Sequence, residues 1–408
     1  MKITELKTFV VGNPPPHFGG LYWIFVKLKT DTGVEGVGEV YSVPFDPYVV
    51  KSMISDVFER WVINTDPFKI ETLWRRAYST GFTQRPDVSM MGILSGIETA
   101  CWDIIGKELN KPVYQLLGGQ VHEKLRSYTY LYPDPDDDRQ IMSNYSTDPD
   151  EKTVYSDADL AAEVAAKFIE QGFTAIKFDP AGPYTAFDPR QLSLPALDHA
   201  EKFTKRLREV AGSKCDLLFG THGQMTPSSA IRLAKRLEKY DPLWFEEPTP
   251  PDNITEMARV ARSTSIPVAT GERLTTKYEF VKVLQAQAAS ILQLALGRSG
   301  GILEGKKIAA LAEAYHAQIA PHLYCGPVEA AANIQLCTCS PNFLIQESIK
   351  TFDGFHAKIL KKPIQWEQGY IIPPTAPGIG VELDEDVALA NPYNGKALHL
   401  QMQADPYY

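Results

Sequence analysis

The chain has 408 residues, 44% of them hydrophobic and 22% charged, which is the composition of a globular protein with a large core. Lys and Arg number 41 while Asp and Glu number 50, so the formal net charge is −9. This mild acidity argues against a nucleic-acid surface, which needs a basic stripe, but it leaves room for an anionic small molecule in a cleft.

The start of the chain, MKITELKTFVVGNPPP, has no continuous apolar stretch, and no run of about 18 apolar residues follows anywhere. We therefore expect a cytoplasmic protein that does not enter a membrane. The cysteines lack the spacing of a metal site, so we expect free buried thiols in a reducing compartment. They are Cys101, Cys215, Cys325, Cys337 and Cys339.

The apolar patterns of residues 1–125 predict an α+β capping domain. Segment 23–41, WIFVKLKTDTGVEGVGEVY, alternates apolar and polar residues around DTG, which predicts a β-hairpin. Segment 90–109 has helical spacing, and we expect that helix to close at the glycines of LGG, residues 117–119.

Residues 126–352 alternate strand-like apolar runs with helical patterns. This repetition predicts a parallel (β/α)8-type barrel, and the absence of a GxGxxG fingerprint disfavours an open dinucleotide-binding sheet. The strand candidates are 125–132, 174–179, 216–221, 243–248, 267–272, 290–296, 318–324 and 343–348.

Two further segments flank the strands. The acidic, polar stretch 133–157 follows the first strand, and it predicts a solvated loop or a lid over the barrel. The tail, residues 353–408, contains the loop-rich stretch IPPTAPGIGVELDED, and we expect it to return to the capping domain.

Ionisable residues recur at the predicted strand ends, where barrels of this type carry their active sites. An unpaired charge inside a closed barrel would cost roughly several kcal/mol, so this set calls for partners or a ligand. The residues concerned are Lys177, Asp179, His222, Glu246, Glu247, Glu272, His322 and Glu347.

A divalent cation is one solution. Glu246 and Glu272 follow adjacent strands, so their carboxylates can converge on one hard cation, and oxygen ligands favour Mg²⁺. The alternative is a network in which both carboxylates pair with Lys177 and Arg273. We favour the cation, because strand alternation turns Arg273 to the face opposite Glu272.

The ordered motifs WFEEP, ATGER, GRSGGI, PHLYCGP and FLIQE resemble the enolase superfamily, and most closely its mandelate racemase-like acid-sugar dehydratases. GIETACWDIIGKELNKPVYQLLGG is similar to the capping-domain signature of that superfamily, so the resemblance covers nearly the whole chain. The ordered set is specific for the superfamily and weak for any one substrate.

The resemblance implies a base that removes the proton α to a carboxylate while Mg²⁺ stabilises the enediolate. By position, Glu246 and Glu272 match metal ligands and Lys177 matches a base or electrostatic group. His322 matches an acid or base, and Glu347 matches an acid that bonds the substrate carboxylate.

Two departures from the family pattern affect these roles. Gly220 stands where the family has a metal-binding aspartate, so water or another side chain, His222 or Asp179, would complete the site. With His222 as a ligand, Mn²⁺, Fe²⁺ or Zn²⁺ would also be admitted. His222 serves equally well as a general acid. Ala295 stands where related enzymes orient the strand-seven histidine with an aspartate, which moves our prediction for the base to Lys177.

Further candidates are Asp179 or Tyr184 as alternative bases, and His17, Arg85, Tyr184 and Arg298 for substrate binding. The predicted activity is dehydration of a sugar acid to a 2-keto-3-deoxy acid, in a homo-oligomer. The alternatives are a cycloisomerase acting on an anhydro-sugar acid or lactone, and a degenerate barrel that binds ligands without catalysis.

Overall fold

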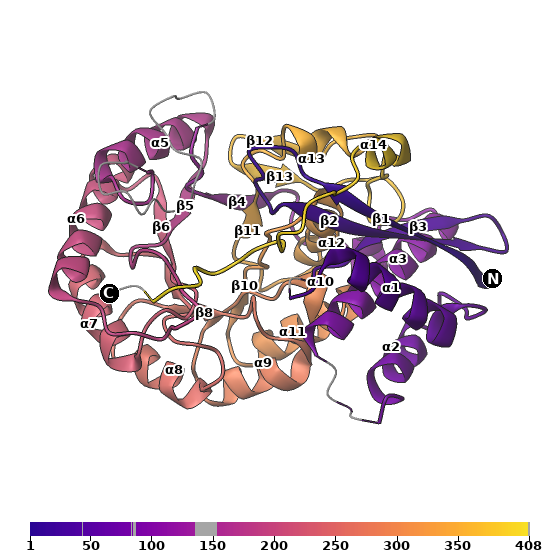
Figure 1. The fold of residues 1–408 in the computed structure, drawn as a ribbon, viewed down its shortest axis with the longest axis horizontal. Coiled ribbons are helices and arrows are strands. Elements are labelled where there is room, and N and C mark those ends of the chain that lie inside the picture. The colour runs from indigo at the N-terminus through magenta and orange to yellow at the C-terminus, as the bar shows by residue number, and fades with distance from the viewer. Residues whose placement is uncertain (43, 83, 85–86, 135–152, 407–408) are drawn as a thin grey trace.

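The computed structural model describes the chain except for residues 43, 83, 85–86, 135–152 and 407–408. The predicted lid segment therefore falls largely outside the described residues. A sheet with its helices lies beside a larger ring of helices and strands (Figure 1). The domain boundaries at 125 and 352 stay predictions.

The described part of the N-terminal region forms an antiparallel sheet in the order β1 (Ile3–Gly12), β2 (Tyr22–Thr30) and β3 (Glu35–Glu39). The predicted hairpin is confirmed, since β2 and β3 pair directly. Gly33 in its turn has φ 85°, a left-handed conformation that glycine adopts without strain.

The helices of this region are α1 (Pro47–Val57), the π-helix η1 (Phe58–Val62), α2 (Ile70–Ser79), α3 (Val88–Glu108) and α4 (Val113–Leu116). The predicted helix end at LGG was wrong for the long helix, because α3 ends at Glu108 and Pro112 prevents its continuation. LGG instead follows α4. Among the described helices only α3 is long and apolar enough to cross a membrane, and it is mostly buried inside the protein as a core helix.

The described part of the chain contains the predicted parallel barrel, and all eight strand predictions are confirmed. Neighbouring strands follow sequence order, β11 pairs with β4, and a bridge between Ile319 and Phe343 closes the ring. The strands are β4 (Leu125–Tyr130), β5 (Ala175–Phe178), β6 (Asp216–Gly220), β7 (Trp244–Glu246), β8 (Val268–Thr270), β9 (Ile291–Leu292), β10 (Gln318–Ile319) and β11 (Gln346–Ser348).

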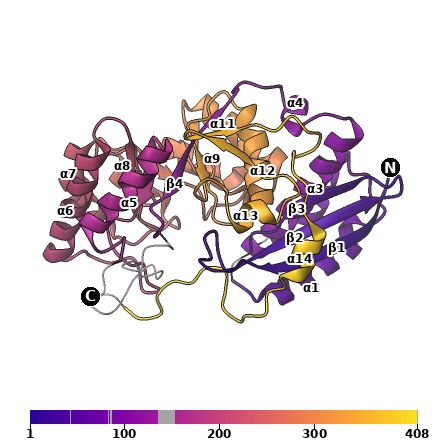
Figure 2. The ribbon, with the colours of Figure 1, turned by 90° about the horizontal axis from the view of Figure 1, so that it is seen from above.

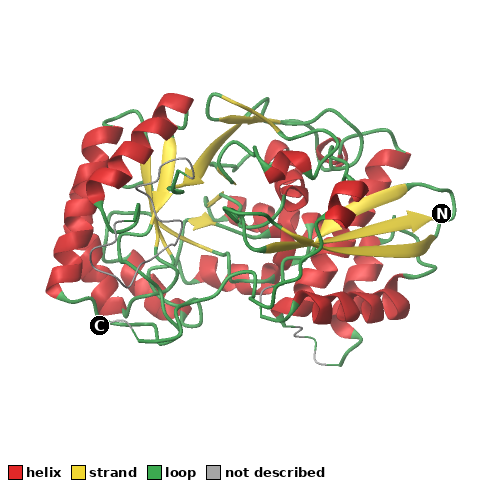
Figure 3. Cartoon of the chain, turned by 45° about the horizontal axis from the view of Figure 1, so that its top comes forward, coloured by secondary structure: helices red, strands yellow, loops and turns green. Residues whose placement is uncertain are grey.

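Helices surround these strands (Figure 3). They are α5 (Ala158–Gln171), α6 (Leu194–Ala211), α7 (Pro227–Leu237) with the 3₁₀ turn η2 (Glu238–Tyr240), α8 (Ile254–Ala261), α9 (Thr276–Gln285), α10 (Leu296–Ser299), α11 (Ile302–Ala314) and α12 (Pro327–Thr338). Apolar side chains on their inner faces form the main core with the outer faces of the strands.

The tail contains α13 (Phe355–Lys358), β12 (Gln365–Glu367), β13 (Tyr370–Ile372) and α14 (Glu385–Ala390). The hairpin β12–β13 was not predicted, and it pairs with β4 in antiparallel fashion. Beyond α14, the Tyr393 amide donates to the Val10 carbonyl of β1 at 3.1 Å. The last described residues then run from the sheet region towards the barrel (Figure 2).

Two buried carboxylates of the N-terminal region hold the starts of barrel helices. Glu98 of α3 accepts from the amides of Ile302 at 2.7 Å and Leu303 at 2.9 Å, at the start of α11. Glu39 of β3 accepts from the amides of Gly326 at 2.6 Å and Glu329 at 2.9 Å, at the start of α12. The first amides of a helix have no acceptor within the helix, so the side-chain oxygens of Glu98 and Glu39 satisfy them and hold the two regions together.

Candidate active site

The barrel interior is built in layers by strand alternation. One buried apolar layer takes a residue from each strand or from the residues adjoining it: Tyr128, Ala175, Leu218, Trp244, Ala269, Ile291, Ala320 and Ile345. Two residues further along four of these strands stand Lys177, Glu246, His322 and Glu347. The apolar layer is therefore the floor below the charged layer.

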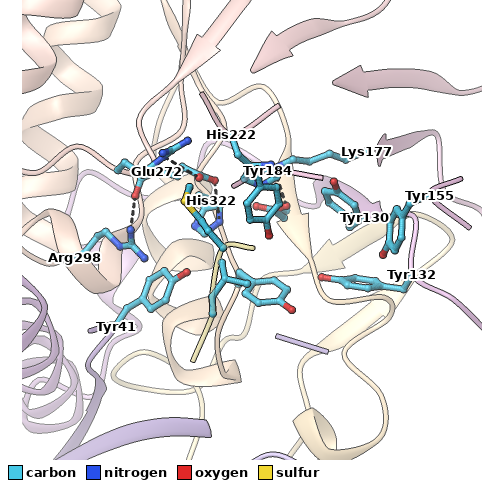
Figure 4. Close-up of a pocket in the computed structure, with 15 residues that line it drawn as sticks. Tyr41, Tyr130, Tyr132, Tyr155, Lys177, Tyr184, His222, Glu272, Arg298 and His322 are labelled. Atoms are coloured by element: carbon cyan, nitrogen blue, oxygen red, sulfur yellow. Dashed lines mark hydrogen bonds and ion pairs between the residues drawn. The ribbon is translucent and has the colours of Figure 1, made fainter. Parts of the chain in front are cut away.

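A cavity of about 230 Å³ lies above this floor (Figure 4). Its lining is Tyr41, Tyr130, Tyr132, Tyr155, Lys177, Tyr184, His222, Glu272, Arg273, Arg298, His322, Tyr324, Glu347, Leu400 and Met402. Seven of the predicted site residues are among these, which means that the structure brings most of the candidates together.

Four predicted site residues do not line the cavity or cannot be placed. Glu246 and Asp179 are buried directly beside it and contact residues that line it. His17 lies in the loop before β2, where its Nδ1 is 2.6 Å from the Asn13 carbonyl. Arg85 lies outside the described residues.

Lys177 is the cation at the centre of the charged layer. Its Nζ lies 2.7 Å from Glu246 Oε1 and 3.4 Å from Glu347 Oε1. Burial by itself lowers the pKa of Lys177, but the charges of the surrounding carboxylates raise that pKa above its ordinary value. A lysine that stays protonated is a poor base, so the geometry favours an electrostatic role for Lys177 over proton removal.

The ion-pair network that the sequence led us to disfavour is present at Glu246. Besides Lys177, Glu246 accepts through Oε2 from Gln293 Nε2 at 2.7 Å and from Trp244 Nε1 at 3.2 Å. Both of its oxygens are thus occupied by donors from the protein.

Our prediction that Arg273 points away from the site was wrong. Arg273 lines the cavity, donates to Glu247 Oε2 at 2.7 Å, and lies 3.7 Å from Glu272 Oε1. Strand alternation does not apply here, because β8 ends at Thr270 and Gly271 then adopts φ 143°.

His322 faces Glu272 across the cavity, with 3.3 Å between Nε2 and Oε2. Its buried Nδ1 has no hydrogen-bond partner among the described residues, as expected from the apolar Ala295. Burial lowers the pKa of His322 to about 4 even though Glu272 opposes the shift. His322 is therefore neutral at ordinary pH and free to accept a proton.

His222 has the opposite character. It follows β6 with φ 51°, its Nδ1 lies 3.5 Å from Asp179 Oδ2, and its ring packs on Tyr184. Burial alone lowers the pKa of His222, but the contact with Asp179 and the charge of Glu272 outweigh it and raise the pKa. His222 is therefore suited to donate a proton.

Arg298 is a further cation in the cavity wall, beside Lys177 and Arg273. Its guanidinium lies 3.8 Å from the ring centroid of Tyr41, and Nη1 donates to the backbone carbonyl of Glu272 at 3.0 Å. Its buried Nε has no partner in the part of the chain that the structure describes. Arg298 can therefore receive an anionic or hydroxyl group of a ligand.

Sequence reasoning missed most of the aromatic lining. Tyr130 and Tyr132 continue the alternation of the first barrel strand, and Tyr324 continues that of His322, so strand periodicity could have found these three. Tyr41 and Met402 come from the capping region and the tail, and no local pattern reveals that they meet the barrel.

The predicted metal ligands do not converge on a common point. Within the described residues, no group of three or more His, Cys, Asp or Glu side chains is placed to hold a metal ion. Gly220 itself offers no carboxylate, and a Cβ added there would lie 2.5 Å from Cε of Lys177, so a longer side chain would require the end of the lysine to shift. With Glu246 also occupied by Lys177, the residues present do not fit a divalent cation.

Comparison with known proteins agrees with the fold. Residues 159–387 match the family model for the enolase C-terminal domain-like fold. Residues 20–118 match the model for the mandelate racemase/muconate lactonizing enzyme N-terminal domain.

The relatives match nearly the whole chain. The D-galactonate dehydratases of Cronobacter sakazakii and Ralstonia pickettii are each 34% identical, over 96% and 95% of this chain and 94% of each relative. A solved structure of a candidate mandelate racemase/muconate lactonizing enzyme from Burkholderia SAR-1 is 63% identical, with a TM-score of 0.95, and the match covers 100% of this chain and 98% of that one. The mandelate racemase/muconate lactonizing enzyme from Sulfitobacter sp is 51% identical with a TM-score of 0.94, over 100% and 99% of the two chains. The chain belongs to the enolase superfamily, in its mandelate racemase/muconate lactonizing enzyme branch.

Proposed function

We propose that the protein is a hydro-lyase that dehydrates a sugar acid to a 2-keto-3-deoxy acid. The observation that carries this proposal is a pair of histidines, His322 and His222, that face one cavity with opposite pKa shifts. The names of the D-galactonate dehydratases that the chain resembles support the same class of reaction.

In this reaction His322, as the neutral imidazole, takes the proton from the carbon α to the carboxylate. The electron pair moves onto the carboxylate and forms an enediolate, whose negative charge faces Lys177. His222 then donates its proton to the β-hydroxyl, which leaves as water. The enol that remains becomes the keto acid, so R–CHOH–CHOH–COO⁻ gives R–CH₂–CO–COO⁻ and H₂O.

The remaining charged residues hold the reacting groups in place. Glu347 accepts from the Leu323 amide at 2.8 Å and lies beside Lys177, so we assign it to the positioning of Lys177. Arg298, with its unpartnered Nε, binds the substrate at a carboxylate or hydroxyl oxygen. Asp179 orients His222 and keeps it protonated.

Members of the enolase superfamily typically use a divalent metal for the enediolate step. The donor set described above does not fit such an ion, so no step of the proposed reaction passes through one. The superfamily and the dehydratase relatives favour an enzyme over a degenerate binding barrel.

A cycloisomerase remains the second candidate, and the aromatic wall is the observation that favours it. Tyr130 and Tyr155 lie with their ring centroids 6.0 Å apart at the cavity. Tyrosine rings offer flat faces to a cyclic substrate such as an anhydro-sugar acid or lactone. In that case the leaving oxygen stays attached, and the product has the mass of the substrate.

A library of aldonic and aldaric acids, with D-galactonate first, tests the proposal when products are trapped with semicarbazide. We expect a keto acid lighter than its substrate by one water. Keto products of unchanged mass would favour the cycloisomerase, and no reaction with any cyclic or acyclic acid would contradict both.

A further inference from the structure

We propose that the ammonium group of Lys177 takes the place of the divalent cation that related enzymes use against the enediolate. This inference rests on the proposed function for its catalytic meaning. Its physical basis is the packing of Lys177 against Gly220 and the carboxylates around it.

The first observation is the place of the ammonium group. Lys177 is 2% exposed and reaches from β5 into the charged layer, where Nζ lies 2.7 Å from Glu246 and 3.4 Å from Glu347. Glu246 is one of the two carboxylates expected to hold a metal. The cation that it holds in this chain is a side chain, and Lys177 also lines the cavity.

The second observation is the space at Gly220. The three heavy atoms nearest to a Cβ built there all belong to Lys177, with Cε at 2.5 Å, Cγ at 3.4 Å and Cδ at 3.5 Å. Gly220 does not have the positive φ that would make glycine a backbone requirement. Glycine therefore leaves room for the lysine stem in the position that it takes in this structure, at the place where the resemblance puts a metal-binding aspartate.

The two observations explain each other. A side chain at position 220 would meet the flexible end of Lys177, so an aspartate there would require the lysine to shift from the position in which its ammonium contacts Glu246. An ammonium supplies a single positive charge and hydrogen-bond donors that need no loading from solution. A donor aimed at an oxyanion in a water-poor site stabilises the charge that develops there.

Metal binding tests the inference without any substrate. Protein dialysed against EDTA is titrated with Mn²⁺ by calorimetry and by electron paramagnetic resonance. The proteins compared are the wild type, Lys177→Met, the double variant Gly220→Asp/Lys177→Met, and Lys235→Met as a control at an exposed lysine of α7. We expect no Mn²⁺ bound by the wild type or by the control, and one ion per chain bound by the double variant.

Two results would overturn the inference. One is a wild type that binds one Mn²⁺ per chain and loses it on Glu246→Gln. The other is a double variant that keeps the circular dichroism and cooperative melting of the wild type yet binds no ion, because the ammonium and the ion would then not share a site.

Turnover gives a second readout once a substrate is known. The wild type should keep its rate in EDTA, and Lys177→Met should lose about 10²–10³-fold in kcat, the usual effect of removing one oxyanion donor. A wild type that EDTA inactivates and Mg²⁺ restores would overturn the inference. If the wild type converts no acid, the proposed function fails. The number of Mn²⁺ ions bound per chain by each variant still decides whether Lys177 takes the place of the cation.

Discussion

His322 and His222 show how two identical side chains acquire different chemistry from their surroundings. Among the described residues His322 has no hydrogen-bond partner at its buried Nδ1 and one carboxylate at Nε2, so burial dominates and its pKa falls to about 4. His222 has Asp179 at its Nδ1 and feels Glu272, so its pKa rises. The surroundings therefore shift the pKa values of the two histidines in opposite directions without a difference in residue type.

We predict that His322→Asn stops exchange of the substrate α-hydrogen with deuterated solvent. General base catalysis contributes about 10²–10⁴-fold, so turnover should fall by a similar factor. Nuclear magnetic resonance of the recovered substrate measures the exchange. If exchange survives in His322→Asn and disappears in Lys177→Met, the lysine is the base.

His222→Asn is predicted to separate the two halves of the reaction. The α-hydrogen should still exchange, because His322 and Lys177 are intact, whereas formation of the keto acid should fall by about 10²–10⁴-fold for want of an acid. The same resonance experiment gives both rates. Loss of exchange and of product to the same extent would refute the assignment of His222 as the acid.

The pH profile of kcat/KM should be a bell. The base must be neutral, so activity should rise as the pH passes about 4, the pKa of His322. The acid must be protonated, so activity should fall above the raised pKa of His222. Asp179→Asn removes the main cause of that raised pKa. In this variant the alkaline limb of the pH profile should therefore move to lower pH. An alkaline limb that does not move would argue against the role given to Asp179.

Glu98 illustrates the scale of whole elements. It lies on α3 of the N-terminal region and accepts hydrogen bonds from the first amides of the barrel helix α11. Glu98→Ala leaves the amides of Ile302 and Leu303 without an acceptor, and we predict a loss of about 2–3 kcal/mol in the free energy of unfolding. Urea unfolding measures this loss, with the exposed Glu108→Ala on the same helix as the control.

The free energy of unfolding that is lost in Glu98→Ala should depend on pH. Burial raises the pKa of this carboxyl from its ordinary value to about 8. The contribution of Glu98 to stability is therefore complete below about pH 4.5 and declines as the pH rises through 8. If Glu98→Ala and the wild type have the same free energy of unfolding at pH 5, the role of Glu98 at the start of α11 is contradicted.

The tail is the second element that completes the site from a distance. Leu400 and Met402 line the cavity, and the Gln403 amide donates to the Tyr184 carbonyl at 3.2 Å. We predict that Leu400→Ala/Met402→Ala raises KM several-fold and leaves the melting temperature unchanged, since both residues are partly exposed. Leu389→Ala on the exposed face of α14 is the control, and an unchanged KM would exclude the tail from substrate binding.

Sequence periodicity was sufficient to predict the fold and part of the site where the chain forms regular strands. The eight barrel strands, and the convergence of Lys177, His322 and Glu347, follow from alternation and from the shared orientation of parallel strands. It failed just past the strand ends, where Gly271 redirects Arg273 towards the cavity. It also failed for the lysine stem beside Gly220, because that contact joins two strands and depends on side-chain volume.

At the scale of the whole molecule, the site is assembled from three parts of the chain. The barrel supplies the charged layer, the N-terminal region supplies Tyr41, and the tail supplies Met402. Buried carboxylates at the starts of α11 and α12 keep the N-terminal region seated on the barrel. The cavity therefore depends on contacts that are far apart in sequence, and all five cysteines are buried and free rather than crosslinked.

The central claim is that the side chains of this cavity remove an α-proton and then expel water from a sugar acid. The most direct test is mass spectrometry of the product formed from D-galactonate, or from the acid that the library identifies, in deuterated water containing EDTA. We predict a 2-keto-3-deoxy acid that has lost one water and gained one deuteron at carbon 3. A product of unchanged composition apart from deuterium, or no product until a divalent metal is added, would contradict the account.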